Sequence, residues 1–167
     1  MLPYPNISPE IIKIGPLSIR WYGLMYLIGF ICSYFIVKRE INRRGLKVEK
    51  DFLEHLYFYL ILGLLVGARV GYVLFYNLPY YLQHPLEIFA IWHGGMSFHG
   101  GLIGVIVSAW IFTKIKKFDF FTLTDMLVIA APIGIGLGRI GNFINGELYG
   151  RPTNVPWAMI FPEGGPL

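Results

Sequence analysis

Arg139, Asn142 and Glu147 lie close together in segment 138–151 and carry the groups best suited to chemistry. The residues before them are apolar and rich in glycine, so Arg139 is expected where a transmembrane helix meets the membrane interface. An arginine near the centre of such a helix costs about 2.5–3.5 kcal/mol on insertion scales. This guanidinium, with an amide and a carboxylate close behind, is therefore interpreted as a functional site. The alternative is a snorkelling arginine with polar capping groups.

His99 lies between the glycine pairs at 94–95 and 100–101, at the start of an apolar run. Glycine allows backbone or ligand to approach closely, and the positive end of a helix dipole favours phosphate. An imidazole there can act as a general base or acid. On the residue alone, a structural histidine remains the alternative, and His93 is interpreted that way.

Arg139 and Arg69 can each hold a phosphodiester through a planar, bidentate fork. For Arg69 two roles are open: contact with a lipid headgroup oxygen, or a structural pair with an acid such as Glu147. Asn142 follows Arg139 by one helical turn and is expected to orient it or the lipid, while Glu147 is its candidate counter-ion. The glycines between 134 and 150 are attributed mainly to helix packing.

The composition indicates a membrane protein. Hydrophobic residues make up 55% of the chain and charged residues 14%, with a mean hydropathy of +0.57, whereas soluble domains carry about 25% charged residues. The net charge of +4 comes from loops between apolar runs, which indicates topology and not nucleic-acid binding. The single Cys32 predicts no internal disulfide and no metal site. Residues 1–15 lack a basic region before an apolar core, so no cleavable signal peptide is expected.

Four apolar runs predict an all-α polytopic membrane protein, a single integral membrane domain over 1–167, because lipid cannot satisfy open backbone groups. The predicted spans are 20–37, 56–76, 96–113 and 123–141, followed by an outer segment at 142–167. Loops 38–51 and 114–119 are rich in Lys and Arg, whereas 77–95 contains neither. The positive-inside rule then places the N-terminus, 77–95 and 142–167 outside, with the polar candidates on an outward-facing rim. Segment 77–95 is either a short interfacial helix anchored by Trp92 or an ordinary loop.

Four segments, 20–26, 67–77, 94–101 and 138–151, resemble in order the motifs of the prolipoprotein diacylglyceryl transferases. They begin with Arg20-Trp21-Tyr22-Gly23, Gly67-Ala68-Arg69-Val70, Gly94-Gly95-Met96-Ser97 and Gly138-Arg139-Ile140-Gly141. The match extends from about residue 14 to Phe161. That family is longer, with further spans and a second functional arginine beyond the segment matched here.

The resemblance implies transfer of a diacylglyceryl group from phosphatidylglycerol to the lipobox cysteine of a prolipoprotein signal peptide, releasing glycerol 1-phosphate. It implies a multi-pass protein of the bacterial cytoplasmic (inner) membrane that needs no cofactor or metal. His99 would be the base and Arg139 the phosphate-binding residue. The expected substrate-binding residues are Tyr22, Arg69, Asn142, Glu147 and Gly150.

Two rival interpretations remain from the sequence. One is a truncated, non-catalytic membrane module that binds phospholipid or packs with other helices. The other is a small transporter, which the lack of paired inverted repeats disfavours. For Tyr22 an aromatic anchor at the interface is the alternative role. Without the second arginine, the 167-residue chain alone is expected to bind phosphatidylglycerol weakly and to turn over poorly or not at all.

Overall fold

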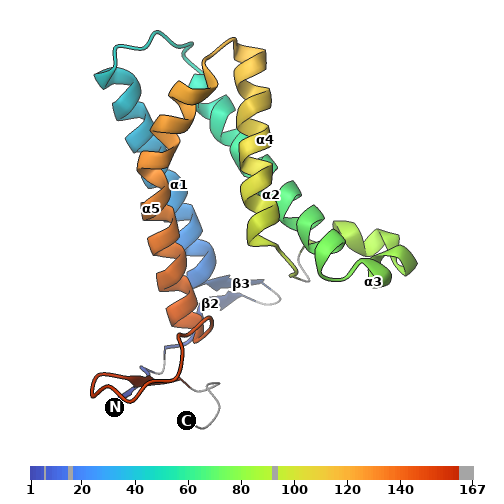
Figure 1. The fold of residues 1–167 in the computed structure, drawn as a ribbon, viewed down its shortest axis with the longest axis vertical. Coiled ribbons are helices and arrows are strands. Elements are labelled where there is room, and N and C mark those ends of the chain that lie inside the picture. Colours follow the sequence, from blue (N-terminus) through green and yellow to red (C-terminus); the bar gives the residue numbers. More distant parts are fainter. Residues whose placement is uncertain (6, 15–16, 92–93, 162–167) are drawn as a thin grey trace. The chain divides into compact units, whose positions relative to one another are not determined.

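A computed structural model describes residues 1–5, 7–14, 17–91 and 94–161 of the protein. Within these ranges, four helices are long and apolar enough to cross a membrane: α1 (Trp21–Arg43), α2 (Phe52–Phe75), α4 (Phe98–Lys116) and α5 (Phe120–Asn145) (Figure 1). The predicted all-α polytopic membrane class is confirmed. Past the predicted spans, α1 and α4 continue into residues 38–43 and 114–116, which are mostly charged, whereas α5 continues into residues 120–122 and 142–145, which are not.

The shorter elements lie in the connections and at the two ends of the chain. Segment 77–95 contains α3 (Leu78–Gln83) and the 3-10 helix η1 (Pro85–Phe89), each with a proline in its first turn. Trp92 and His93 lie outside the described residues. Strand β1 (Leu2–Pro3) pairs in parallel with β4 (Met159–Ile160), and β2 (Glu10–Ile14) pairs antiparallel with β3 (Leu17–Arg20). The hydropathy pattern did not predict these strands.

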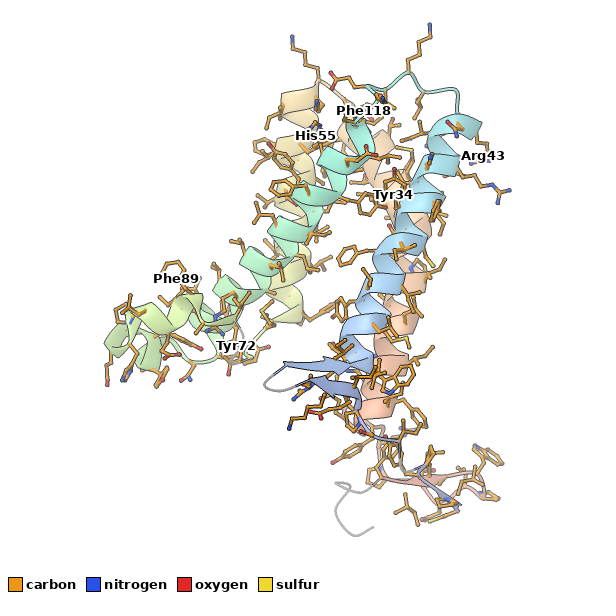
Figure 2. The ribbon with its side chains drawn as sticks, turned by 180° about the vertical axis from the view of Figure 1, so that it is seen from behind. Tyr34, Arg43, His55, Tyr72, Phe89 and Phe118 are labelled. Atoms are coloured by element: carbon orange, nitrogen blue, oxygen red, sulfur yellow. The ribbon has the colours of Figure 1, made fainter. Side chains whose placement is uncertain are left out.

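The contacts divide the chain into two units, residues 1–39 with 127–167, and residues 40–126. In the second unit α2 packs against α4 (Figure 1), with Leu56 and Phe112 fully buried. The Phe52 ring meets the Phe112 ring edge-on, with centroids 5.1 Å apart. His55 and Phe118 lie at one end of this unit, and Tyr72 lies towards the other (Figure 2).

A seam of small residues sets the distance between α2 and α4. Glycines recur at every fourth position on α2, and small residues do so on α4. They are Gly63, Gly67 and Gly71 on α2, and Gly100, Gly104 and Ser108 on α4. A Cβ added to Gly71 would lie 2.7 Å from the Gly100 Cα, and one added to Gly104 would overlap the Gly63 carbonyl oxygen. Such close approach replaces the missing hydrophobic driving force between helices in lipid.

We expect Gly104→Ala to lower the melting temperature of the protein in detergent. The new methyl group would meet main chain that cannot rotate away, and overpacking typically costs about 1–3 kcal/mol. The matched control is Gly136→Ala on α5, where no described atom lies within 4 Å of the added Cβ. Equal melting temperatures for the two variants would contradict the close α2–α4 contact.

In the first unit, α1 runs beside α5 (Figures 1 and 2), and a Cβ on Gly29 would lie 3.5 Å from the Gly134 Cα. The Tyr4 hydroxyl donates to the carbonyls of Phe143 at 2.7 Å and Ile144 at 2.9 Å. These carbonyls belong to the last turn of α5, where the helix has no partners for them. The N-terminal segment therefore caps the end of α5.

Candidate functional site

The end of α5 is a helix stop built from the residues that follow Arg139. Gly146 has φ +70°, and its N–H donates to the Phe143 carbonyl at 3.0 Å. The N–H of Glu147 donates to the Asn142 carbonyl at 3.0 Å. This pair of bonds is a Schellman motif, in which glycine adopts the left-handed conformation without strain. The motif turns the chain sharply and brings Glu147 back onto the helix.

The Glu147 carboxylate is held by two asparagines. Its Oε1 accepts hydrogen bonds from Nδ2 of Asn142 and Nδ2 of Asn145, both at 3.1 Å. Asn142 is buried, so it orients the carboxylate. Glu147 was expected to be the counter-ion of Arg139, but in the structure its carboxylate binds the two asparagines. Arg139 is exposed, and its guanidinium forms no hydrogen bond or ion pair with the part of the chain that the structure describes.

Tyr22, in the first turn of α1, packs against α5 beside this motif. A Cβ on Gly141 would lie 2.7 Å from Cδ2 of Tyr22, so the tyrosine ring occupies the space that a side chain would need. The Tyr22 hydroxyl lies 3.2 Å from the Tyr26 hydroxyl, and the two rings are 5.0 Å apart. The structure therefore brings Tyr22, Asn142 and Glu147 to one end of the first unit.

A polar cavity of about 420 Å³ adjoins the same helix end. Its lining combines a guanidinium, two carboxylates, a hydroxyl and an amide, from Ser8, Pro9, Glu10, Arg20, Asn145 and Glu147. The Asn145 Oδ1 is buried and accepts no hydrogen bond within the described residues. Such a lining suits a molecule with several hydroxyl groups. Only Glu147 was singled out from the sequence. Asn145 lies in the same motif, but the others depend on β2 and β3, which hydropathy did not predict.

His99 is the second residue of α4. The Ser97 Oγ caps this helix by accepting the Gly100 N–H at 3.2 Å, and the Ser97 N–H donates to the Ala68 carbonyl at 2.9 Å. His99 is exposed, and its ring lies edge-on to the neighbouring Phe98 ring, with centroids 5.6 Å apart. His99 therefore lies at the positive end of the helix dipole, and it forms no hydrogen bond with the described residues.

Arg69 lies on α2 and is 5% exposed. All five of its N–H groups point at main-chain carbonyls, which belong to Glu87, Ile88, Ala90, Gly94 and Gly95. Two roles were open for Arg69 from the sequence. Among the described residues it has no carboxylate partner, which the structural pair required, and no donor directed at open space, which contact with a lipid headgroup required.

Gly150 is exposed, and no described atom lies within 4 Å of a Cβ added there.

The predicted site residues thus form two groups, one in each unit. Tyr22, Asn142 and Glu147 gather at the end of α5, on which Arg139 also lies, while Arg69 and His99 flank the turn before α4. The glycines at 136, 138 and 150 do not pack against any described atom, unlike Gly141. Within the described ranges, no three His, Cys, Asp or Glu side chains gather closely enough to hold a metal ion.

Comparison with known proteins finds the same family that the four sequence motifs resemble. A family model described as prolipoprotein diacylglyceryl transferase matches residues 9–167. Three similar proteins are each named phosphatidylglycerol–prolipoprotein diacylglyceryl transferase. The one from Geobacter sulfurreducens is 56% identical over 97% of this chain and 62% of its own length. The one from Desulfotalea psychrophila is 60% identical over 98% of this chain and 60% of its own length. The one from Bordetella parapertussis is 55% identical over 99% and 63%, respectively.

The chain thus spans about three fifths of the length of these relatives. The match covers both groups of candidate residues, in α1 and α5 and in α2 and α4, together with the connections between them. The chain belongs to the prolipoprotein diacylglyceryl transferase family.

Proposed function

We propose that this chain carries part of the active site of an enzyme that transfers a diacylglyceryl group from phosphatidylglycerol to a prolipoprotein. The acceptor is the thiol of the lipobox cysteine, and glycerol 1-phosphate is released. The observation that supports this most is the match to relatives of that name over nearly the whole chain, including the exposed Arg139 and His99. The substrate provides the nucleophile, so Cys32 has no required part.

In the proposed reaction, His99 transfers the proton and Arg139 binds the phosphate. A free cysteine has a pKa of about 8.5, so its thiol needs a base to react near neutral pH. His99 accepts the thiol proton, and the sulfur forms a bond to the glycerol carbon of the diacylglyceryl group. The bond from that carbon to the phosphate oxygen breaks, and the phosphate leaves with the electron pair. Arg139 binds the phosphate and stabilises the charge that builds on it.

The helix end around Glu147 positions the lipid. Asn142 and Asn145 fix the carboxylate through Oε1, which leaves Oε2 to accept a hydroxyl of the glycerol headgroup. The adjoining polar cavity has room for that headgroup. The Tyr22 ring packs against Gly141 on the same helix, and Gly150 leaves space open on the chain that follows the helix.

Incubating a chain extended to the length of the relatives in phosphatidylglycerol vesicles with a lipobox peptide tests the function. We expect labelled diacylglycerol to move onto the peptide and glycerol 1-phosphate to appear in equal amount. A peptide with serine in place of the cysteine is the control, because its hydroxyl is a far weaker nucleophile. Lipid binding without transfer to the cysteine peptide would reject the enzymatic function and favour a lipid-binding module.

We further propose that the N-terminus and segment 77–95 face the outside of the cytoplasmic membrane. The ion pair between Lys116 and Glu49 joins the two basic loops at one end of the second unit, and α2 carries the chain to the other end. That opposite end has no Lys or Arg in segment 77–95, and several of its apolar side chains are exposed. Leu82 is 73% exposed and Leu86 is 84% exposed, as suits an interfacial segment.

Labelling of single cysteines would test this topology. In a Cys32→Ser background, Gln83→Cys is expected to react with an impermeant maleimide added outside cells. Lys47→Cys, in a basic loop, is the matched control and should react only after the membrane is permeabilised. The reverse pattern would overturn both the topology and the outward-facing site.

A further inference from the structure

We infer that Arg69 is a positioning residue that fixes the turn before α4 and thereby the place of His99. This inference rests on the proposed function, since it assigns the arginine a role in the same transfer reaction. Arg69 touches neither His99 nor an open surface, so its effect would be transmitted through main chain.

The contacts of Arg69 account for the whole donor set of a guanidinium. The Nε donates to the Ile88 carbonyl at 2.8 Å, and Nη2 donates to Glu87 at 2.5 Å and Ala90 at 3.2 Å. The Nη1 donates to Gly94 at 2.6 Å and Gly95 at 3.1 Å. No donor is left over for a lipid phosphate, because arginine has five N–H groups.

These bonds join two short pieces of chain, in the first of which the Glu87 carbonyl also accepts the Ala90 N–H at 3.1 Å. One piece is the end of η1, and the other is the turn that leads into α4. Irregular backbone at membrane depth is tolerated only where its polar groups are satisfied. The guanidinium provides this satisfaction, and the Tyr81 ring covers it at 5.1 Å.

The backbone of the turn requires glycine, and the turn is tightly fitted. Gly94 has φ +84° and Gly95 has φ +80°, conformations that L-residues rarely adopt. A Cβ on Gly95 would lie 2.5 Å from Cε1 of Tyr72 and 3.0 Å from Nη1 of Arg69. On its other side, the turn is held by the Ser97 N–H on the Ala68 carbonyl.

The path from Arg69 to His99 is therefore short. Ala68 and Arg69, adjacent on α2, hold both sides of the turn, and Ser97 at its end caps α4. Gly100, next to His99, lies against Gly71 and fixes the helix on the same surface of α2. Lysine in place of Arg69 would keep the charge but has three donors in no planar fork, so it cannot hold both pieces.

The experiment compares Arg69→Lys with His99→Ala in a chain extended to the length of the relatives. We expect Arg69→Lys to lower kcat by up to the contribution of the general base, about 10²–10⁴-fold, with KM for phosphatidylglycerol little changed. The lost rate should partly return at raised pH, and Arg69→Lys should add little loss in the His99→Ala background. Arg43→Lys, which alters an arginine bonded to Glu40 at 2.7 Å, is the control and should keep normal activity.

Hydrogen exchange of segment 94–101 gives a readout independent of turnover. We expect faster exchange there in Arg69→Lys and unchanged exchange in His99→Ala. Gly95→Ala alters the other partner of the Arg69–Gly95 contact and should give the same result as Arg69→Lys. It replaces Arg69→Lys in the experiment if that variant does not accumulate in the membrane. A raised KM with normal kcat, a loss that adds fully to that of His99→Ala, or unchanged exchange would overturn the inference. If transfer fails in every protein but exchange responds, the positioning contact stands and the proposed function is wrong.

Discussion

Replacement of Arg139 by alanine is expected to lower kcat for diacylglyceryl transfer by at least about 10²–10³-fold, the loss typical when one group that stabilises transition-state charge is removed. The guanidinium is exposed and unpaired within the described part of the chain, so it is available to a phosphate. Arg139→Lys keeps the charge without the planar fork and should remain nearly inactive if bidentate contact is required. Initial rates with labelled phosphatidylglycerol and a lipobox peptide measure both variants.

The control for Arg139 is Arg39→Ala, which removes an exposed arginine near the C-terminal end of α1. It should change the rate little, because that arginine lies on the side predicted to face the cytoplasm. Near-normal transfer by Arg139→Ala would show that the central assignment is wrong.

The length of the chain adds a further test of Arg139. We expect the 167-residue chain to insert, to bind phosphatidylglycerol weakly and to turn over poorly, since the relatives are longer. A chain extended to the length of those relatives should transfer efficiently with Arg139 present and not with alanine there. Full activity of the purified 167-residue chain would show that its residues form a complete site.

Helical spans could be predicted from this sequence because lipid requires long, apolar, internally hydrogen-bonded segments. The close packing of α2 on α4 could also have been predicted, since Gly63, Gly67 and Gly71 recur at one helical spacing. From the sequence, helix packing was attributed to the glycines between 134 and 150 instead. Of those, Gly141 packs against Tyr22, whereas Gly136 meets no described atom. Spacing alone does not tell which glycine faces a neighbouring helix.

The contacts of the predicted site residues could not be predicted from the sequence. The Asn-Gly-Glu run at the end of α5 allows a Schellman motif to be expected, yet the role of Glu147 depends on its hydrogen bonds from Asn142 and Asn145. For Arg69 the partners are backbone carbonyls between residues 87 and 95. Side-chain patterns carry no information on such partners, because any residue type supplies the same carbonyl.

Replacement of His99 by alanine is expected to lower kcat by about 10²–10⁴-fold, the usual contribution of general acid–base catalysis, while phosphatidylglycerol still binds. The exposed imidazole at the start of α4 is placed to take a proton from an incoming thiol. As pH rises towards the thiol pKa of about 8.5, a growing fraction of the acceptor is thiolate without any base. The variant should therefore recover part of its rate between about pH 7 and 9, a range in which the unaltered enzyme gains less.

His55→Ala is the matched control, because His55 is also exposed on a helix of the second unit but lies at its other end (Figure 2). It should leave both kcat and its pH dependence unchanged. Lipid binding is measured separately with labelled phosphatidylglycerol, so that loss of the base is distinguished from loss of a phosphate ligand. If His99→Ala loses lipid binding and turnover in equal measure and shows no recovery at high pH, His99 binds phosphate or stabilises the fold, and the proton passes to another group.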